Sequence, residues 1–230
     1  MKNFLFLTVC GVLMAMISCV NSGEVQWQTT DVATIGKPLK VKQFADVNVI
    51  GPMQVFFSQD KTHSVKVDAS KAAFDKLLIY VNENELYITT KPDEQLGDTD
   101  VAMQDVKVYV TAPSLKEVSM TGDGSITVTS PVSASLLDID LTGSGNIFFN
   151  GLIDSKSVDV ELTGSGKIDV VNLKATKLKT QLTGSGQINF QNANVDKAES
   201  FITGTGDVVI KGSVREHVKK NIGSGKVIDD

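Results

Sequence analysis

The stretch Leu141-Thr142-Gly143-Ser144-Gly145 returns along the second half of the chain with few changes. The first glycines of its six copies are 19 to 21 residues apart, and the last copy lacks the threonine. A period of this length indicates a solenoid, in which each repeat forms one coil. The glycines predicted to form the bends are Gly122, Gly124, Gly143, Gly145, Gly164, Gly166, Gly184, Gly186, Gly204, Gly206, Gly223 and Gly225.

Apolar and polar residues alternate on both sides of each copy, as in residues 137–141 and again from Ile147 onward. This period of two, with many β-branched residues, predicts strands. Glycine is needed at the bend because neighbouring coils lie about 4.8 Å apart, leaving no room for a Cβ, and because we expect a positive φ there. Each coil then closes through a short return containing residues such as Leu152, Leu173 or Val195. The predicted fold class is all-β, a right-handed parallel β-helix (solenoid) with about 20 residues per coil.

The residues before these repeats form a less regular version of them. Residues 47–57 match residues 139–149 in apolar pattern, with Gly51-Pro52 at the bend. We expect a capping coil at the end of the stack, because an outer edge does not need the donor that proline lacks. Further strands are predicted at 64–67, 77–81, 86–90 and 106–111, with a helical turn at 71–76 and a loop at 91–102. The solenoid domain is therefore 41–228, divided into an irregular β capping half (41–114) and regular repeats (115–228).

The first 18 residues are predicted to be a lipoprotein signal peptide. Lys2 precedes an apolar run at 4–17 that is too short to span a bilayer. The run ends in Met16-Ile17-Ser18-Cys19, which resembles the lipobox of bacterial lipoproteins except that methionine replaces the usual leucine. We expect lipidation of Cys19, with residues 19–40 as a lipid-anchored tether. The alternative is an ordinary signal peptide followed by an incidental cysteine.

Composition and charge exclude several classes of ligand. The chain of 230 residues has a formal net charge of -5, which excludes a nucleic acid held by bulk charge. Two cysteines and two histidines are too few for a zinc cage, so no metal site and no cofactor are predicted. The segment Gly164-Ser165-Gly166-Lys167 lacks both the earlier glycine and the following Ser or Thr of a phosphate loop. No nucleotide is therefore expected.

The repeat alignment brings four carboxylates together on the outward side. Asp138 and Asp140 precede one bend, and Asp159 and Glu161 precede the next, so they form a two-by-two square on adjacent coils. Because stacked like charges destabilise one another, this square is either a cation-binding or glycan-contacting face, or a solvated strand face. The same alignment predicts two outward columns of equivalent positions. In one, Lys219 on the last coil follows Glu199 on the coil before it, and in the other Asn221 follows Phe201.

No catalytic residue is predicted. His63 and His217 are far apart in sequence, and neither has a cysteine partner or a serine in a nucleophile-elbow context. We expect both histidines to be structural or to lie at the surface.

A family resemblance covers about residues 41–222. Residues 44–57, 65–67, 85–88 and 108–115, together with the repeated Thr-Gly-Ser-Gly-x-Ile, resemble the auto-transporter adhesin head domain, or head GIN domain, of Bacteroidetes lipoproteins. The resemblance implies a β-helix fold, an anchor in the outer membrane and a role in adhesion. It implies no catalytic residues.

The sequence thus predicts a non-catalytic, lipid-anchored cell-envelope protein, an adhesin or binding module that presents a rigid solenoid face to a glycan or protein. One alternative is a periplasm-facing structural or accessory envelope protein, and a more distant one is a polysaccharide-active β-helix enzyme. We expect an exported outer-membrane lipoprotein. Residues 20–24 lack the Lys/Asp/Glu-rich stretch typical of surface-bound lipoproteins of this kind, so both sides of the outer membrane stay open.

Overall fold

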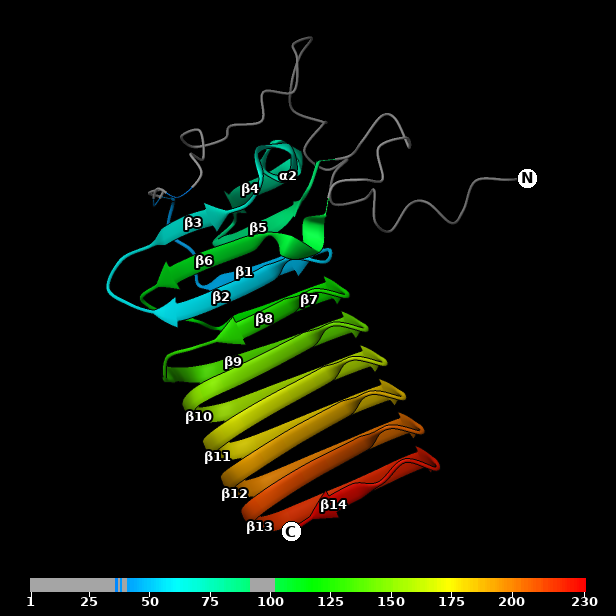
Figure 1. Ribbon diagram of the computed structural model, residues 1–230. Coiled ribbons are helices and arrows are strands. Elements are labelled where there is room, and N and C mark those ends of the chain that lie inside the picture. Colours follow the sequence, from blue (N-terminus) through cyan, green and yellow to red (C-terminus); the bar gives the residue numbers. More distant parts are fainter. Residues whose placement is uncertain (1–35, 37, 39–40, 92–101) are drawn as a thin grey trace, which may run out of the picture.

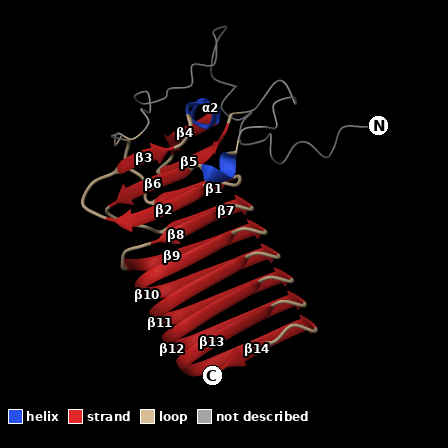
Figure 2. Ribbon diagram, viewed as in Figure 1, coloured by secondary structure: helices blue, strands red, loops and turns tan. Residues whose placement is uncertain are grey.

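The computed structural model describes residues 36, 38, 41–91 and 102–230, which form a β-solenoid of about six turns (Figure 1). Its strands join into one continuous hydrogen-bonded system with equivalent positions about 20 residues apart. Strands make up nearly all of the described secondary structure (Figure 2). The predicted β-solenoid is therefore confirmed. The predicted signal peptide, Cys19 and nearly all of the tether lie outside the described residues.

The regular half stacks its strands in parallel and in register. Val160 pairs with Ile139 on the preceding coil and with Thr180 on the next, and each first glycine of a bend pairs with its equivalent. The strands are β7 (Glu117–Gly122), β8 (Ser125–Val128), β9 (Val132–Gly143), β10 (Asn146–Gly164), β11 (Lys167–Gly184), β12 (Gln187–Gly204), β13 (Asp207–Gly223) and β14 (Val227–Asp229).

The N-terminal half contains the elements that alternation and turn residues predict. Asn82 pairs with Glu85 across a two-residue turn in which Glu83 and Asn84 have positive φ. The elements are β1 (Asp46–Ile50), β2 (Gln54–Gln59), β3 (Ser64–Asp68), α2 (Lys71–Lys76), β4 (Leu77–Asn82), β5 (Glu85–Thr90), the 3-10 helix η2 (Met103–Asp105) and β6 (Lys107–Ala112). The predicted loop at 91–102 falls mostly outside the described residues.

The prediction that the coil containing Gly51-Pro52 ends the stack is wrong. Strands β1 and β2 of this coil pair in parallel with β7 and β8 on one side and with β5 and β6 on the other. The antiparallel strands β4 and β3 then follow β5 and β6. Pro52 lies in the bend between β1 and β2, outside both strands, where proline is tolerated even inside the stack.

One apolar core runs through the whole stack. Ile147, Ile168 and Ile188 occupy one fully buried column, and Phe149 and Phe190 lie in another. Core residues extend from Phe44 to Ile210 as a single cluster. Within the described ranges, no helix is long and apolar enough to cross a membrane.

The short returns are paired strands rather than loops. Ile153, Leu173 and Ala193 pair in register and are buried, so the β-ladder continues around this corner. Leu152, which the sequence also places in a return, pairs with Asn172 rather than Leu173 and is 41% exposed. A shift in register between Phe149 and Leu152 moves this leucine to the outside.

Candidate functional site

A polar groove of about 660 Å³ lies along the return corner of the regular repeats. It is lined by residues 133–135 of β9, 154–156 of β10, 174–176 of β11, and Asn194 and Asp196 of β12. Strands β9 to β12 stack on one another (Figure 1), so the groove that their residues line crosses four successive coils.

In each of the segments 133–135, 154–156 and 174–176, the middle residue has a small side chain, which explains why this corner is hollow. Ala134, Ser155 and Ala175 pair with one another in register, and their flanking residues are exposed. Ser155 turns its hydroxyl back to the chain and donates to the Ser157 carbonyl at 2.8 Å. The longer flanking side chains therefore form rims above a floor of small residues.

The groove offers both hydrogen-bond donors and acceptors. Lys174 and Asp154 lie side by side on the same rim, with Nζ 3.0 Å from Oδ2, and both side chains are largely exposed. Thr176 and Asn194 add a hydroxyl and an amide. Exposed ion pairs of this kind contribute at most about 1 kcal/mol to stability, so these groups are available to a ligand. This mixture suits a neutral, polyhydroxylated molecule.

The second candidate surface is the acidic face, defined as Asp46, Glu85, Glu117, Asp138, Asp140, Asp159 and Glu161. The structure places the four carboxylates of the predicted square on neighbouring strands, with Asp138 opposite Asp159 and Asp140 opposite Glu161. Glu117 pairs with both Asp138 and Asp46, and Asp46 pairs with Glu85. The alignment of repeats missed Asp46 and Glu85 because the degenerate coils do not share the period.

Burial and mutual repulsion raise the pKa values of carboxylates on this face. Burial, followed by the charges of Glu161, Asp138 and Asp159, raises the pKa of Asp140 to about 6. Burial and neighbouring carboxylates also raise the pKa of Glu117 and Asp138. These carboxylates thus cost folding energy when all are ionised. Among the residues that the structure describes, no three metal-ligating side chains are placed to hold an ion.

Polar and aromatic groups flank the acidic face on its N-terminal side. Asn48 pairs with Ser119 on one side and Tyr87 on the other, and its amide donates to Glu85 Oε1 at 2.9 Å. In the described parts of the chain, Asn48 Oδ1 is the one buried side-chain polar atom that lacks a hydrogen-bond partner. Tyr87 in turn stacks on Tyr80 with ring centroids 5.0 Å apart.

The predicted columns fail at the last coil. Val218, not Lys219, pairs with Glu199, and Lys220, not Asn221, pairs with Phe201. Gly223 remains in register with Gly204 although the threonine is missing, so the preceding residues shift by one. Because side chains alternate between faces, this shift exchanges inside and outside.

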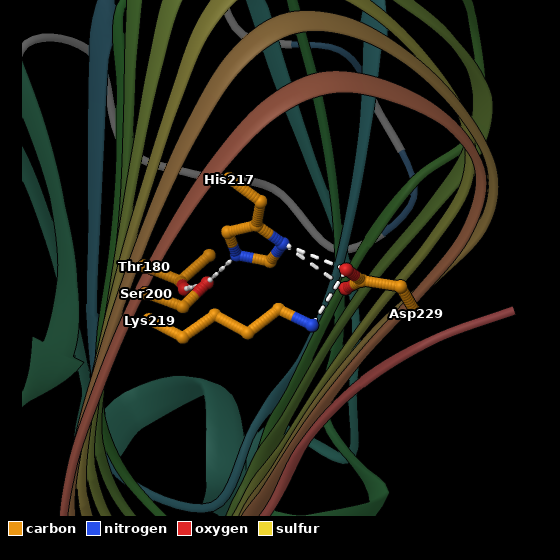
Figure 3. Close-up of polar contacts among 5 residues, drawn as sticks. All are labelled: Thr180, Ser200, His217, Lys219 and Asp229. Atoms are coloured by element: carbon orange, nitrogen blue, oxygen red, sulfur yellow. Dashed lines mark hydrogen bonds and ion pairs between the residues drawn. The ribbon is translucent and has the colours of Figure 1, made fainter.

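As a result, His217 and Lys219 of β13 turn inward and, with residues of β11, β12 and β14, form a plug at the C-terminal end of the interior (Figure 3). We define the plug as Thr180, Ser200, His217, Lys219 and Asp229. Thr180 donates to Ser200 Oγ at 2.8 Å, and Ser200 Oγ lies 2.9 Å from His217 Nε2. His217 Nδ1 lies 3.0 Å from Asp229 Oδ1, and Lys219 Nζ lies 2.6 Å from Asp229 Oδ2.

Ser200, His217 and Asp229 are linked in the same order as the serine, histidine and aspartate of serine hydrolases. The serine hydroxyl of the plug, however, is not accessible to a substrate. Ser200 is 1% exposed, and its hydroxyl is covered by His217 on one side and Thr180 on the other. A substrate carbonyl has no path to Ser200 Oγ in this arrangement. The contacts instead satisfy polar groups where the apolar core ends.

Charges in the plug favour the ionised form of Asp229. Burial alone would raise its pKa, but the hydrogen bond from Lys219 and the contact with His217 outweigh burial and lower it. His217 is thus structural, as expected. His63 lies within 3.0 Å of the Phe44 carbonyl and packs edge-on against the Phe44 ring.

The family model for "Putative auto-transporter adhesin, head GIN domain" matches residues 43–228 of this chain. The chain belongs to the head GIN domain family. The family name points to adhesion at the cell envelope and names no enzymatic activity. Among curated proteins, none matches the sequence significantly.

Solved structures with the same fold include three from Parabacteroides and Bacteroides species. A "putative lipid binding protein" of Parabacteroides distasonis is 22% identical, with a TM-score of 0.69, covering 85% of this chain and 96% of its own. A "putative adhesin" of Bacteroides fragilis is 19% identical, with a TM-score of 0.64 and the same coverage. A further "putative adhesin", from Parabacteroides merdae, is 18% identical, with a TM-score of 0.58, covering 85% of this chain and 95% of its own. The match covers nearly all of each of these solved chains, and in the present chain the single apolar core extends from Phe44 to Ile210.

Proposed function

We propose that this head GIN domain protein is a non-catalytic, lipid-anchored binding module of the cell envelope, of adhesin type, whose groove binds a glycan. The observation that carries the proposal is the groove at 133–135, 154–156 and 174–176, a concave surface with both donors and acceptors. The family name supports adhesion. A rigid stack suits this role because it holds the groove without ordering a loop on binding.

The groove suits a glycan better than the acidic face does. Sugar hydroxyls both donate and accept, and the groove presents Lys174, Asn194 and Thr176 beside Asp154 and Asp196. The acidic face presents mainly acceptors at neutral pH. The groove is also hollow, so it can remove more of a ligand surface from water.

A glycan array probed with residues 41–230 tests this proposal. Thr176→Trp fills the groove and is expected to reduce binding to the best glycan at least tenfold. Asn194→Ala removes one amide and is expected to reduce binding about fivefold, the usual value of one hydrogen bond. Thr163→Trp is the matched control, because Thr163 is an exposed residue beside the glycine bend and outside the groove. Equal effects of the two tryptophans, or no glycan bound by the unaltered domain, would contradict the proposal.

The acidic face supports a second candidate function, the binding of a cationic group such as an ammonium or guanidinium. The unpartnered Asn48 Oδ1 favours this, since such a cation brings donors as well as charge. We expect a lysine-rich peptide to bind with an affinity that falls as salt rises. The double variant Asp140→Asn with Glu161→Gln should abolish most of this binding. Asp154→Asn with Asp196→Asn removes the same charge in the groove and should leave it unchanged; the reverse result would exclude the face.

Lipid anchoring is tested in cells. Cys19→Ser should abolish fatty-acid labelling and move the protein out of the membrane fraction, whereas Cys10→Ser should change neither. Retention of Cys19→Ser in the membrane fraction would contradict the anchor. Protease added to intact cells then distinguishes the two sides of the outer membrane. A protected domain would exclude adhesion to other cells and favour the periplasm-facing alternative.

A further inference from the structure

The C-terminal end of the solenoid has an open strand edge. Residues 212–223 of β13 pair with β12, but β14 pairs only with residues 208–210. Gly212 N–H still donates to the Asp230 carbonyl at 2.9 Å, but in the part of the chain that the structure describes no strand lies beyond residues 213–223, so the ladder is open on that side. At the other end, antiparallel strands β3 and β4 follow the last parallel coil.

Apolar side chains are exposed along this edge. The one-residue shift of the last coil turns Glu216, Val218, Lys220 and Ile222 outward. Val218 is 51% exposed and Ile222 is 62% exposed. On the preceding coil the same positions hold Glu199 and Thr203, as polar positions on a solvated face should. The solenoid itself therefore gives no reason for these two apolar residues.

We propose that this edge pairs in antiparallel fashion with the same edge of a second copy, about a two-fold axis at Val218. The sequence of the edge is complementary to itself in this register. Val218 lies opposite the partner's Val218, and Glu216 lies opposite the partner's Lys220 in both directions. Antiparallel pairs of this kind contribute through apolar contact and opposite charge. The symmetric arrangement closes as a dimer.

Other registers bring like charges together. An axis at Lys219 would place this lysine opposite the partner's Lys219, and an axis at Lys220 would do the same for that residue. Like charges directly opposite each other in an antiparallel pair are destabilising. With the axis at Val218, Lys219 lies opposite the partner's His217, and both side chains already contact Asp229 within their own copy. Charge therefore favours the axis at Val218 over the axes at Lys219 and Lys220.

Disulfide trapping tests the register directly. Cys10 and Cys19 both precede residue 41, so a cysteine introduced into residues 41–230 is the only thiol present. With the axis at Val218, the two cysteines of a Val218→Cys dimer lie opposite each other. Their Cα atoms are then about 4.5–5.5 Å apart, within reach of a disulfide. Most of the protein should become a disulfide-linked dimer under mild oxidation. Ile222→Cys is the control, because its opposite residue is the partner's Val214, so it should form no disulfide although Ile222 is more exposed. Equal crosslinking of both variants, or none of Val218→Cys, would overturn the register.

Light scattering on residues 41–230 tests the dimer itself. The unaltered domain should show twice the monomer mass, and Glu216→Lys or Lys220→Glu should each weaken dimerisation at least tenfold. The double variant should restore it, because the charges are exchanged rather than removed. Lys177→Glu reverses a charge two coils from the edge and should have no effect. A monomer at every concentration, filaments in place of dimers, or insensitivity to the single reversals would overturn the proposal, with circular dichroism showing that each variant is folded.

Discussion

The two glycines of each bend are required for different reasons. Gly164 has φ +128, and a Cβ placed on it would lie 2.3 Å from the carbonyl oxygen of Gly143 on the coil below. Gly166 has an ordinary φ, but a Cβ there would lie 2.5 Å from the Gly145 carbonyl. The first glycine is thus needed for backbone conformation and space, and the second for space alone. Ser165 between them points away from this contact and carries no such constraint.

Asp140 gives a prediction at the same scale. Its pKa in the folded protein, about 6, lies above the ordinary value of 3.8, so the folded state binds a proton more readily than the unfolded state. Stability should therefore rise as pH falls from 7 to about 5. Asp140→Asn should stabilise the domain at pH 7 by about 1 kcal/mol, a figure reduced for solvent screening, and the gain should vanish near pH 4.

Urea unfolding of the variant and the parent at several pH values measures this effect. Asp154→Asn is a suitable control, because Asp154 is an exposed carboxylate paired with Lys174. It should not stabilise the domain at any pH. A stabilisation by Asp140→Asn that is the same at pH 7 and pH 4 would contradict the assignment to ionisation. Below about pH 4 the loss of the Asp229 contacts should lower stability in both proteins, since the pKa of Asp229 is lowered by folding.

At the scale of elements, both bends of each coil are held in register. The glycine bend repeats its backbone hydrogen bonds from coil to coil, as in Ser165 N–H to the Gly143 carbonyl at 2.9 Å. The return corner is also paired, so residues 154–155 lie in the ladder. The alternation of the sequence predicts only a short return at this corner and gives no sign of its pairing. Pairing with two neighbouring coils makes the corner as constrained as the bend.

Insertions of two glycines test this view. After Ser144 or after Ser155, an insertion should lower the free energy of unfolding by roughly 3 kcal/mol or more, because it interrupts a ladder on both sides. After Lys61, in the exposed turn between β2 and β3, the cost should be about 0.5 kcal/mol. Thermal unfolding followed by circular dichroism distinguishes these outcomes. Tolerance of the insertion after Ser155 would show that the corner pairing contributes little.

At the scale of the whole molecule, stability is expected to be distributed along the stack. Strands β10, β11 and β12 each contact mainly the coils before and after them, and equivalent residues meet at every interface. Such a molecule behaves as a sum of coil energies and interface energies. The N-terminal half differs, because β1 and β2 lie between β5 and β6 on one side and β7 and β8 on the other. Its coils therefore depend on segments distant in sequence.

Deletion of one whole coil should then preserve the fold. Removing residues 165–184 joins Gly164 to Ser185, restores the Thr-Gly-Ser-Gly bend and leaves β10 to pair with β12. We expect a single cooperative transition with the melting temperature lowered by roughly 5 to 10 °C. Removing residues 165–174 deletes half a coil and should prevent folding. Calorimetry on both variants measures this, and a folded half-coil deletion would contradict the repeat.

The sequence by itself determined the solenoid, its period and its bend glycines, because those features repeat locally and each copy reports the same backbone requirement. It also determined which carboxylates of the regular coils share a face, since register follows from the repeat. Only the tertiary structure decided the place of the first coil, the pairing of the return corner and the groove, because these depend on segments that meet only after stacking. The plug and the apolar edge at Val218 follow from Gly223 staying in register with Gly204. That choice reverses inside and outside for residues 212–222, after the register shift in β13, and it is made by the energy of coil stacking.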